Sequence, residues 1–198
     1  MKVGLFFGSF NPIHIGHLII SNEALFTKRI DQVWLCPTPK NPHKKKSNLL
    51  IYQKRVDLCR LALGDKSSKI VVNDFERFLD QPNYTANSMR YLVKNYPTYS
   101  FHIIVGEDNY TTLHKWHDAD WLIHSFPFMI YKRLSEHQNS KEAFALYANN
   151  HNYFGCDLIN ISSSSLRRRI KEGRSIQHLT PLPVVEEIEL SKLYKAND

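Results

Sequence analysis

Cysteine is scarce in this chain, and its placement argues against two kinds of cysteine-based site. The 198 residues include three cysteines, and none of them forms a CxxC pair. A disulfide framework or a cysteine zinc site would need clustered cysteines at regular spacing. The ten histidines include no HExxH motif, the helical signature of a zinc site. The cysteines are Cys36, Cys59 and Cys156.

Long apolar runs are also missing. No stretch approaches the ~20 apolar residues that a membrane-spanning helix needs. The first twelve residues carry one lysine and a short apolar run, but Gly8 and Pro12 interrupt it before it reaches the length of a signal peptide. We therefore expect a cytoplasmic protein without a membrane anchor.

Basic residues outnumber acidic ones. The formal net charge is +7 and the sequence pI is about 9.3. Such a balance favours anionic partners, either nucleic acid or small phosphorylated ligands. The densest basic segments are PHKKK at 42–46 and LRRR at 166–169, and either could also be a solvated charged face.

Short apolar runs alternate with stretches of helical spacing. Most of the runs are continuous, which is typical of strands buried on both faces of a parallel sheet. The alternation predicts an α/β fold, a Rossmann-like doubly wound parallel sheet with helices on both faces. The expected strands cover residues 2–7, 32–37, 69–74, 100–106, 127–132 and 156–161. The expected helices cover residues 15–28, 49–63, 85–96, 118–124, 141–148, 164–172 and 182–194.

The chain is expected to form one domain over 1–198. Apolar residues make up 42% of it, enough for a sizeable core. A small helical segment at about 174–198 is expected to pack back on the sheet. Ligands of doubly wound sheets bind beyond the C-terminal ends of the strands, so the residues just after each strand are the candidates.

The first such stretch is GSFNPIHIGH, at 8–17. Gly8 ends a strand, and the following helix starts near His14, so its free N–H groups form an anion site. His14 and His17 share one helical face, and Gly16 leaves room for a ligand to approach the backbone. A zinc site would need further ligands at suitable spacing, which the sequence does not offer. A buried structural role remains open for one ring, but the pattern favours phosphate binding.

Two loops follow the second and third strands. PTPKNPHKKK at 37–46 contains three prolines and several basic side chains, which suits either an anion clamp or a plain charged loop. In QPNYTANSMRYL at 81–92, Thr85 or Asn83 could cap a helix, or its free N–H groups could receive an anion.

Two later stretches complete the set. In IVGEDNYTTLHKW at 104–116, Asp108 follows a strand end and suits a ribose, while Trp116 could stack on an aromatic ring or belong to the core. NISSSSLRRRI at 160–170 opens a basic helix with serines, and Arg167 adds a fixed, bidentate charge for phosphate.

Taken together, these motifs resemble a known family. GSFNPIHIGH resembles the GxFxPxHxGH signature of the nucleotidyltransferase superfamily, and ISSSSLR resembles its second signature, ISxTxIR. The intermediate stretches are similar to those of bacterial nicotinate-nucleotide adenylyltransferases, over about residues 3–170. The resemblance implies a single nucleotidyltransferase domain that joins the AMP part of ATP to nicotinate mononucleotide, giving deamido-NAD and pyrophosphate.

The resemblance also implies roles for the ATP side of the site. His14, His17 and Arg167 would be the catalytic residues, with Ser164 and Arg167 on the β- and γ-phosphates. The residues placed against ATP are Gly8, Ser9, Phe10, His14, His17, Gly106, Asp108, Ile161, Ser162, Ser164 and Arg167. Of these, Ile161 and Ser162 would lie near the adenine, and Gly106 and Asp108 at a ribose. Mg²⁺ would travel on the ATP phosphates without a protein cage of its own.

The mononucleotide side is implied in the same way. Tyr84 and Thr85 would offer backbone N–H groups to the pyridine carboxylate, Trp116 would stack on the ring, and Lys44 would approach the phosphate. The expected partners are ATP and nicotinate mononucleotide, with neither nucleic acid nor membrane, and homo-oligomerisation is left open.

The chain departs from the family pattern in four places. Ser9 stands where glycine is common, Asn11 and Asn87 replace common aspartates, and Glu107 sits inside the GxD stretch. The alternatives are an adenylyltransferase that prefers nicotinamide mononucleotide or phosphopantetheine, and a basic nucleic-acid-binding module. His14, Trp116 and the chain length argue against phosphopantetheine.

Overall fold

A single parallel sheet organises the molecule. The computed structural model describes residues 1–39, 49–64, 69–131, 151–155 and 160–195. Within these residues, six strands form one sheet in the order β3-β2-β1-β4-β5-β6, and every neighbouring pair is parallel. The strands are β1 (Lys2–Gly8), β2 (Gln32–Pro37), β3 (Ile70–Val72), β4 (Ser100–Gly106), β5 (Phe128–Tyr131) and β6 (His151–Phe154). The Rossmann-like α/β fold expected from the sequence is therefore confirmed.

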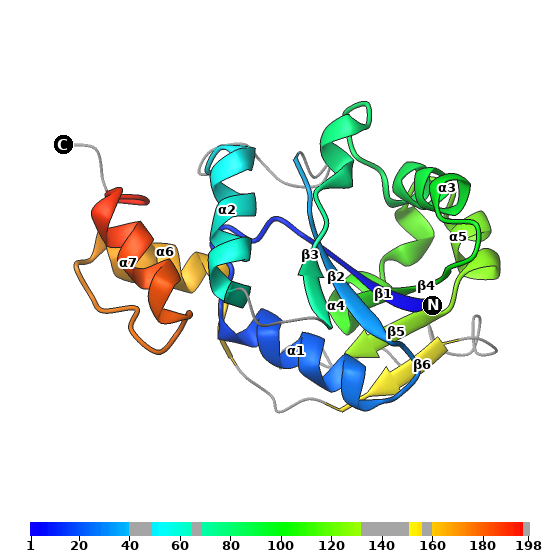
Figure 1. The fold of residues 1–198 in the computed structure, drawn as a ribbon, viewed down its shortest axis with the longest axis horizontal. Helices are drawn as coiled ribbons and strands as arrows, with labels where there is room; N and C mark the ends of the chain where they lie inside the picture. The colour runs from blue at the N-terminus through cyan, green and yellow to red at the C-terminus, as the bar shows by residue number, and fades with distance from the viewer. Residues whose placement is uncertain (40–48, 65–68, 132–150, 156–159, 196–198) are drawn as a thin grey trace.

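Helices cover both faces of the sheet (Figure 1). Helices α1 and α2 contribute to one apolar cluster, and α3 and α5 contribute to the other. The described helices are α1 (Ile15–Phe26), α2 (Tyr52–Leu63), α3 (Thr85–Asn95), α4 (Glu107–Tyr110), α5 (Ala119–Ser125), α6 (Ser163–Lys171) and α7 (Leu182–Leu190). Two short 3₁₀ helices are η2 (Phe75–Phe78) and η3 (Leu113–Lys115).

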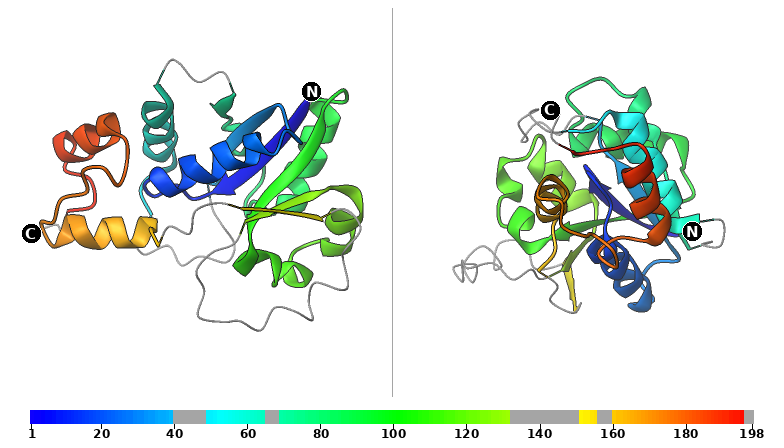
Figure 2. Two further views of the ribbon diagram at one scale, coloured as in Figure 1. Left: turned by 90° about the horizontal axis from the view of Figure 1, so that it is seen from below. Right: turned by 90° about the vertical axis from the view of Figure 1, so that its left-hand side faces the viewer.

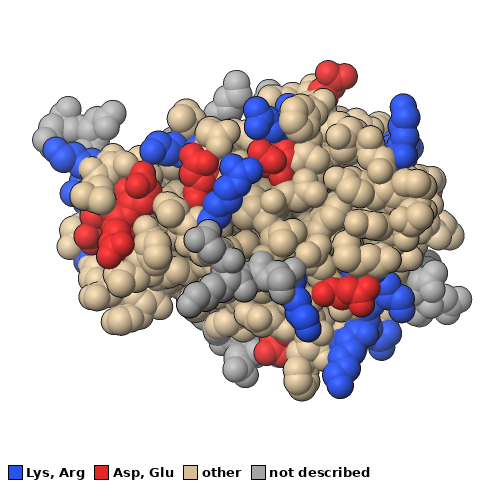
Figure 3. Space-filling view, viewed as in Figure 1, with Lys and Arg blue, Asp and Glu red and all other residues tan. Residues whose placement is uncertain are grey.

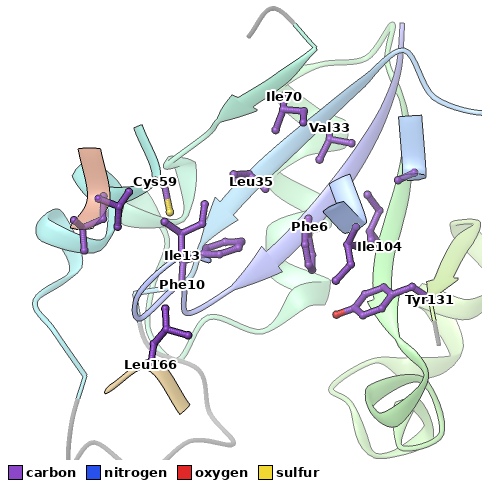
Figure 4. Close-up of a cluster of buried hydrophobic side chains, with 14 of the residues drawn as sticks. Phe6, Phe10, Ile13, Val33, Leu35, Cys59, Ile70, Ile104, Tyr131 and Leu166 are labelled. Atoms are coloured by element: carbon purple, nitrogen blue, oxygen red, sulfur yellow. The ribbon is translucent and has the colours of Figure 1, made fainter. Parts of the chain in front are cut away.

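Strand periodicity divides the core in two. In β1, Phe6 joins the cluster on the α1 and α2 side, while Leu5 joins the cluster on the α3 and α5 side. Successive strand side chains point to opposite faces, so a continuous apolar run feeds both clusters. Figure 4 shows the first cluster, in which Phe10, Ile13 and Leu166 pack beside strand residues although they come from outside the sheet.

The strand order reverses between β1 and β4. The chain runs from β1 outward through β2 and β3, then returns to the other side of β1 to form β4. Gly8 ends β1 and Gly106 ends β4, so both lie at the C-terminal edge of the sheet. Crossover loops leave in opposite directions from this point, which opens a crevice for a ligand.

The structure differs from the sequence expectations at the end of the sheet and at the C-terminus. The strand expected at 156–161 lies mostly outside the described residues, and its last two residues, Asn160 and Ile161, lie in a connection. The sixth described strand is His151–Phe154, which the sequence did not predict. The helix expected at 141–148 lies outside the described residues. Helix α7 packs on α2 rather than on the sheet, and it lies beside α6 at one end of the molecule (Figure 2). In the described part of the chain, no helix combines the length and apolar character that a membrane span requires.

Candidate functional site

The two histidines of the first motif form a stacked pair at the start of α1. His14 is the N-cap residue, in extended conformation, and its backbone N–H donates to Nδ1 of His17 at 3.1 Å. The His17 N–H donates in turn to the His14 carbonyl at 2.9 Å, and the two ring centroids are 3.7 Å apart. Because Nδ1 of His17 accepts a hydrogen bond, a neutral His17 ring carries its proton on Nε2. The fold therefore sets His17 as an Nε2–H donor.

Phe10 holds the His17 ring from the core side. The ring centroids of Phe10 and His17 are 4.9 Å apart and nearly perpendicular, and Phe10 is only 1% exposed. Its φ is 42°, in the left-handed region that a side chain rarely adopts. The sequence placed Phe10 against the nucleotide, but its side chain belongs to the core (Figure 4), so only its backbone can face a ligand.

Hydrogen bonds join the two end motifs across more than 150 residues. Nη1 of Arg167 donates to the Asn11 carbonyl at 2.7 Å, and the Ser163 hydroxyl donates to the Pro12 carbonyl at 2.8 Å. Nη2 of Arg167 also donates to the Ser164 hydroxyl at 3.1 Å. A guanidinium has five N–H donors, so these two bonds orient Arg167 without exhausting its capacity to bind an anion. These hydrogen bonds thus hold the loop before α1 against the start of α6.

Helix α6 begins with a reciprocal cap. The Ser165 N–H donates to the Ser162 hydroxyl at 3.1 Å, and the Ser162 N–H donates to the Ser165 hydroxyl at 3.2 Å. The cap explains the run of serines, and it places Ser164 and Arg167 one turn apart on the helix that meets the Asn11–Pro12 loop.

Gly16 is needed for packing rather than for ligand access. A Cβ at this position would lie 2.8 Å from Cγ2 of Ile161 and 3.1 Å from Nδ1 of His14. The sequence predicted an opening for a ligand here, but Ile161 occupies that space. Gly16 is therefore the point where α1 meets the connection into α6.

Replacing Gly16 by alanine should accordingly destabilise the protein by about 1–2 kcal/mol, because Ile161 must move. The His14 ring, whose Nδ1 would lie 3.1 Å from the added Cβ, should also be displaced, which should lower the turnover measured in a steady-state assay. Urea unfolding and steady-state kinetics measure the two effects. Gly155→Ala is the matched control, since no described residue lies within 4 Å of a Cβ there. Equal stability of the two variants would contradict the packing role.

A buried arginine that the sequence did not reveal fastens the loops around the first motif. Arg55 of α2 is 0% exposed, and its guanidinium donates to the carbonyls of Ser9 at 2.6 Å, Thr38 at 2.9 Å and Pro39 at 3.1 Å. Its Nε donates to the Leu50 carbonyl at 3.0 Å. Arg55 thus connects the loop after β1 to both described ends of the loop that follows β2.

A pocket of about 520 Å³ opens at the C-terminal ends of β1 and β4. Its lining includes Gly8, Gly106, Tyr84, Thr85 and Trp116, all of which the sequence had singled out. Tyr84 is the N-cap of α3 with no side-chain cap, and the first turn of α3 has no acidic residue. The sequence offered Thr85 or Asn83 as the cap, but the unblocked N-terminus of α3 points instead to an anion site.

The other described residues that the sequence placed against a substrate do not line this pocket with those five. Asp108 is exposed in α4, close enough to Gly106 that a Cβ on the glycine would collide with its carboxylate. His14, His17, Ser164 and Arg167 lie around the Asn11–Pro12 loop and do not line the pocket. Lys44 lies outside the described residues. Within the part of the chain that is described, no group of three or more His, Cys, Asp or Glu side chains could hold a metal ion.

Glu76 is a further pocket residue that the sequence did not single out. It is 2% exposed, and the Ser88 hydroxyl donates to its Oε1. Burial raises the pKa of Glu76 to about 7, and the hydroxyls of Ser88 and Thr38 offset this only in part. The signal in the sequence was weak, because Glu76 lies in a one-turn helix between two motifs.

The pKa of Glu76 predicts how stability depends on pH. Below the unfolded pKa, near 4.5, both states hold the proton and Glu76 has no effect. As the pH rises from there to about 7, the unfolded chain ionises first, so the folded state loses about 3 kcal/mol of stability. Urea unfolding at about pH 5 and pH 8 measures this effect. The free energy of unfolding of Glu76→Gln, relative to that of the wild type, should be higher at about pH 8 than at about pH 5. If the two proteins differed in free energy of unfolding by the same amount at both pH values, the raised pKa of Glu76 would be contradicted.

The described basic residues do not form a continuous stripe on the face shown in Figure 3. Lysines and arginines there are scattered among other residues, and acidic side chains gather over α7, which contains three glutamates. A nucleic-acid-binding module would be expected to present a basic stripe. This face therefore gives no support to the nucleic-acid alternative.

Comparison with known proteins agrees with this geometry. A family model described as Cytidylyltransferase-like matches residues 5–169. A probable nicotinate-nucleotide adenylyltransferase of Flavobacterium johnsoniae is 40% identical over 195 residues, covering 98% of this chain and 100% of the relative. A protein of the same description from Cytophaga hutchinsonii is 36% identical over 197 residues and covers 100% of both chains.

Solved structures share the fold. The Plasmodium falciparum nicotinic acid mononucleotide adenylyltransferase complexed with NaAD has a TM-score of 0.80 at 19% identity, covering 99% of this chain and 98% of that one. A Vibrio parahaemolyticus structure described as a nicotinate-nucleotide adenylyltransferase of inferred function has a TM-score of 0.71 at 20% identity, covering 99% of this chain and 96% of that one.

Proposed function

Because the chain belongs to the cytidylyltransferase-like family, and nicotinate-nucleotide adenylyltransferases are its relatives over the full length, we infer that it transfers the adenylyl group of ATP to nicotinate mononucleotide. The products are deamido-NAD and pyrophosphate, and the reaction is a step of NAD biosynthesis. The observation that carries this function is the junction of the two end motifs, in which Arg167 and Ser163 bond the loop that leads into the histidine pair.

The reaction needs no protein nucleophile. A 5′-phosphate oxygen of the mononucleotide attacks the α-phosphorus of ATP, a new P–O bond forms, and the bond to the β-phosphate oxygen breaks. The attacking phosphate is already largely ionised at neutral pH, because its second pKa is about 6. The protein therefore has to position two anions and stabilise the charge that develops on the departing pyrophosphate.

We assign the ATP phosphates to the start of α1 and the start of α6. The Nε2–H of His17 and the His14 ring suit the α-phosphate region, since both lie at the positive end of α1. Arg167 and Ser164 suit the departing phosphates, because hydrogen bonds to the Asn11 carbonyl and to the Ser164 hydroxyl hold the guanidinium in a fixed orientation. Ile161, Ser162, Gly106, Asp108 and the backbone of residues 8–10 remain the proposed contacts to the nucleoside.

We assign the pyridine ring to the pocket at the ends of β1 and β4. Trp116 offers a ring face there, and the unblocked N-terminus of α3 at Tyr84 and Thr85 offers N–H groups to a carboxylate. Lys44 remains the proposed contact to the mononucleotide phosphate. Magnesium is proposed to arrive with ATP as part of the substrate, since the described residues offer it no cage.

A pyrophosphate-release assay with MgATP and each pyridine mononucleotide tests this function. We expect release with nicotinate mononucleotide, and slower release with nicotinamide mononucleotide, because helix N–H groups favour the carboxylate. Absence of release with both substrates would overturn the assignment.

A further inference from the structure

The proposed chemistry leaves one carboxyl group of the pocket unused. Glu76 lines the pocket, is 2% exposed, and has one oxygen, Oε1, held by the Ser88 hydroxyl. Its other oxygen, Oε2, is buried and makes no hydrogen bond of normal geometry to any described residue, although the Thr38 hydroxyl lies close enough to the carboxyl group to lower its pKa. A buried acceptor without a donor is costly, so this oxygen suits either a ligand donor or a proton of its own.

A second buried acceptor lies beside it. Nδ2 of Asn83 donates to the Glu76 carbonyl at 3.1 Å, while Oδ1 of Asn83 is buried and has no hydrogen-bond donor among the described residues. Asn83 also lines the pocket, directly before the Tyr84 cap of α3. Ser88, which holds Glu76, is itself in the first part of α3. The carboxyl group therefore belongs to the same wall as the proposed site of the pyridine substituent.

We propose that Glu76 is a specificity-determining residue that reads the acid or amide substituent of the pyridine ring. When protonated, its Oε2–H donates to the carboxylate of nicotinate mononucleotide. When ionised, it repels that carboxylate and accepts an N–H of the nicotinamide group instead. This inference rests on the proposed function and adds to it a residue that sets the choice between the two mononucleotides.

No other charge fixes the protonation of Glu76. No ion pair to it occurs among the described residues, and the first turn of α3 carries no acid. The titratable groups that face it are the Cys36 thiol from β2 and the Tyr52 phenol from α2, and burial raises the pKa of both.

The other charged groups near Glu76 are on its own segment or across the pocket. They are Asp74 and Arg77, which pair with each other at 3.5 Å, and Lys115 and His117 in the pocket lining. Because the pKa of Glu76 is about 7, the carboxyl can change state within the neutral range.

The test compares kcat/KM for the two mononucleotides in the wild type and in Glu76→Gln. In the wild type, the ratio of nicotinate to nicotinamide efficiency should fall by up to about 100-fold between about pH 6 and pH 8, because the protonated fraction of Glu76 falls about tenfold while its ionised fraction rises about tenfold. The phosphate titrates alike in both substrates, so it cancels in the ratio. Glutamine keeps the acceptor for Ser88 and is a permanent donor, so the ratio of the variant should stay constant over this range.

Two further variants make the test sharper. Glu189→Gln on the exposed side of α7 should reproduce the wild-type profile. In Ser88→Ala, the efficiency ratio should fall at a higher pH than in the wild type, because the Ser88 hydrogen bond lowers the pKa of Glu76. A purely structural role of Ser88 would change the rates without moving this midpoint, so the variant remains informative if Glu76→Gln fails to fold.

The outcomes separate this inference from the proposed function. A ratio that is constant in the wild type, or that falls equally in Glu76→Gln, overturns the role of Glu76 while the enzyme remains an adenylyltransferase. Absence of pyrophosphate release with both substrates overturns the proposed function itself.

Discussion

Replacing His17 by alanine is expected to lower kcat by about 100- to 1,000-fold while the protein stays folded. His17 has Nδ1 engaged by the His14 N–H, so its Nε2–H is the donor that we propose for a phosphate of ATP. In a site that works by charge stabilisation, the loss of one oriented donor affects the transition state more than the bound substrate. The KM for ATP should therefore change less than kcat.

Two amide variants distinguish the donor from the helix cap. Asparagine at position 17 can place an acceptor where Nδ1 stands but has nothing at the position of Nε2, so its kcat should fall as far as that of alanine. Glutamine can reach the Nε2 position with an N–H, so the kcat of this variant should fall only about tenfold. Thermal unfolding should change little in all three, because a lost helix cap is worth about 1 kcal/mol.

Single-turnover kinetics make the measurement decisive, because they report the chemical step without product release. Near-normal turnover in His17→Ala would remove His17 from the catalytic set. Equal kcat values in the asparagine and glutamine variants would show that the Nε2–H is not the group that acts.

The first motif was readable from sequence because its residues act close to one another in the chain. Gly8, His14 and His17 lie within one strand end and one helix start, and backbone geometry alone brings them together. The apolar runs predicted β1, β2, β4 and β5 for the same reason, since each of these strands is a local segment with side chains buried on both faces of the sheet.

Arg55 and Glu76 could not be found this way because their roles come from contacts between distant segments. In sequence, Arg55 is one of several basic residues of a helix, and its partner Ser9 is 46 residues away. Gly16 shows the same limit: the sequence predicted an opening, but Ile161 fills it from the other end of the chain. The strand at 151–154 was missed because HNYF is only partly buried and is not a continuous apolar run.

Replacing Arg55 by methionine is expected to destabilise the protein by about 4 kcal/mol, since hydrogen bonds to a charged group contribute about 1.5–3 kcal/mol each and water can replace only some of them. The four carbonyls that lose their donor belong to Ser9, Thr38, Pro39 and Leu50. The melting temperature should fall by about 10 °C, given roughly 2–4 °C for each kcal/mol in a chain of this size.

A second variant separates the charge of Arg55 from the geometry of its guanidinium. Arg55→Lys keeps a positive charge but replaces the planar fork by one ammonium, which cannot reach four carbonyls in different directions, so it should lose nearly as much stability as methionine. Arg60→Met is the matched control on the same helix, because Arg60 is half-exposed and its pairs with Asp57 and Asp74 should contribute less than about 1 kcal/mol. Urea unfolding followed by circular dichroism measures all three, and Arg55→Lys as stable as the wild type would show that charge rather than geometry holds the loops together.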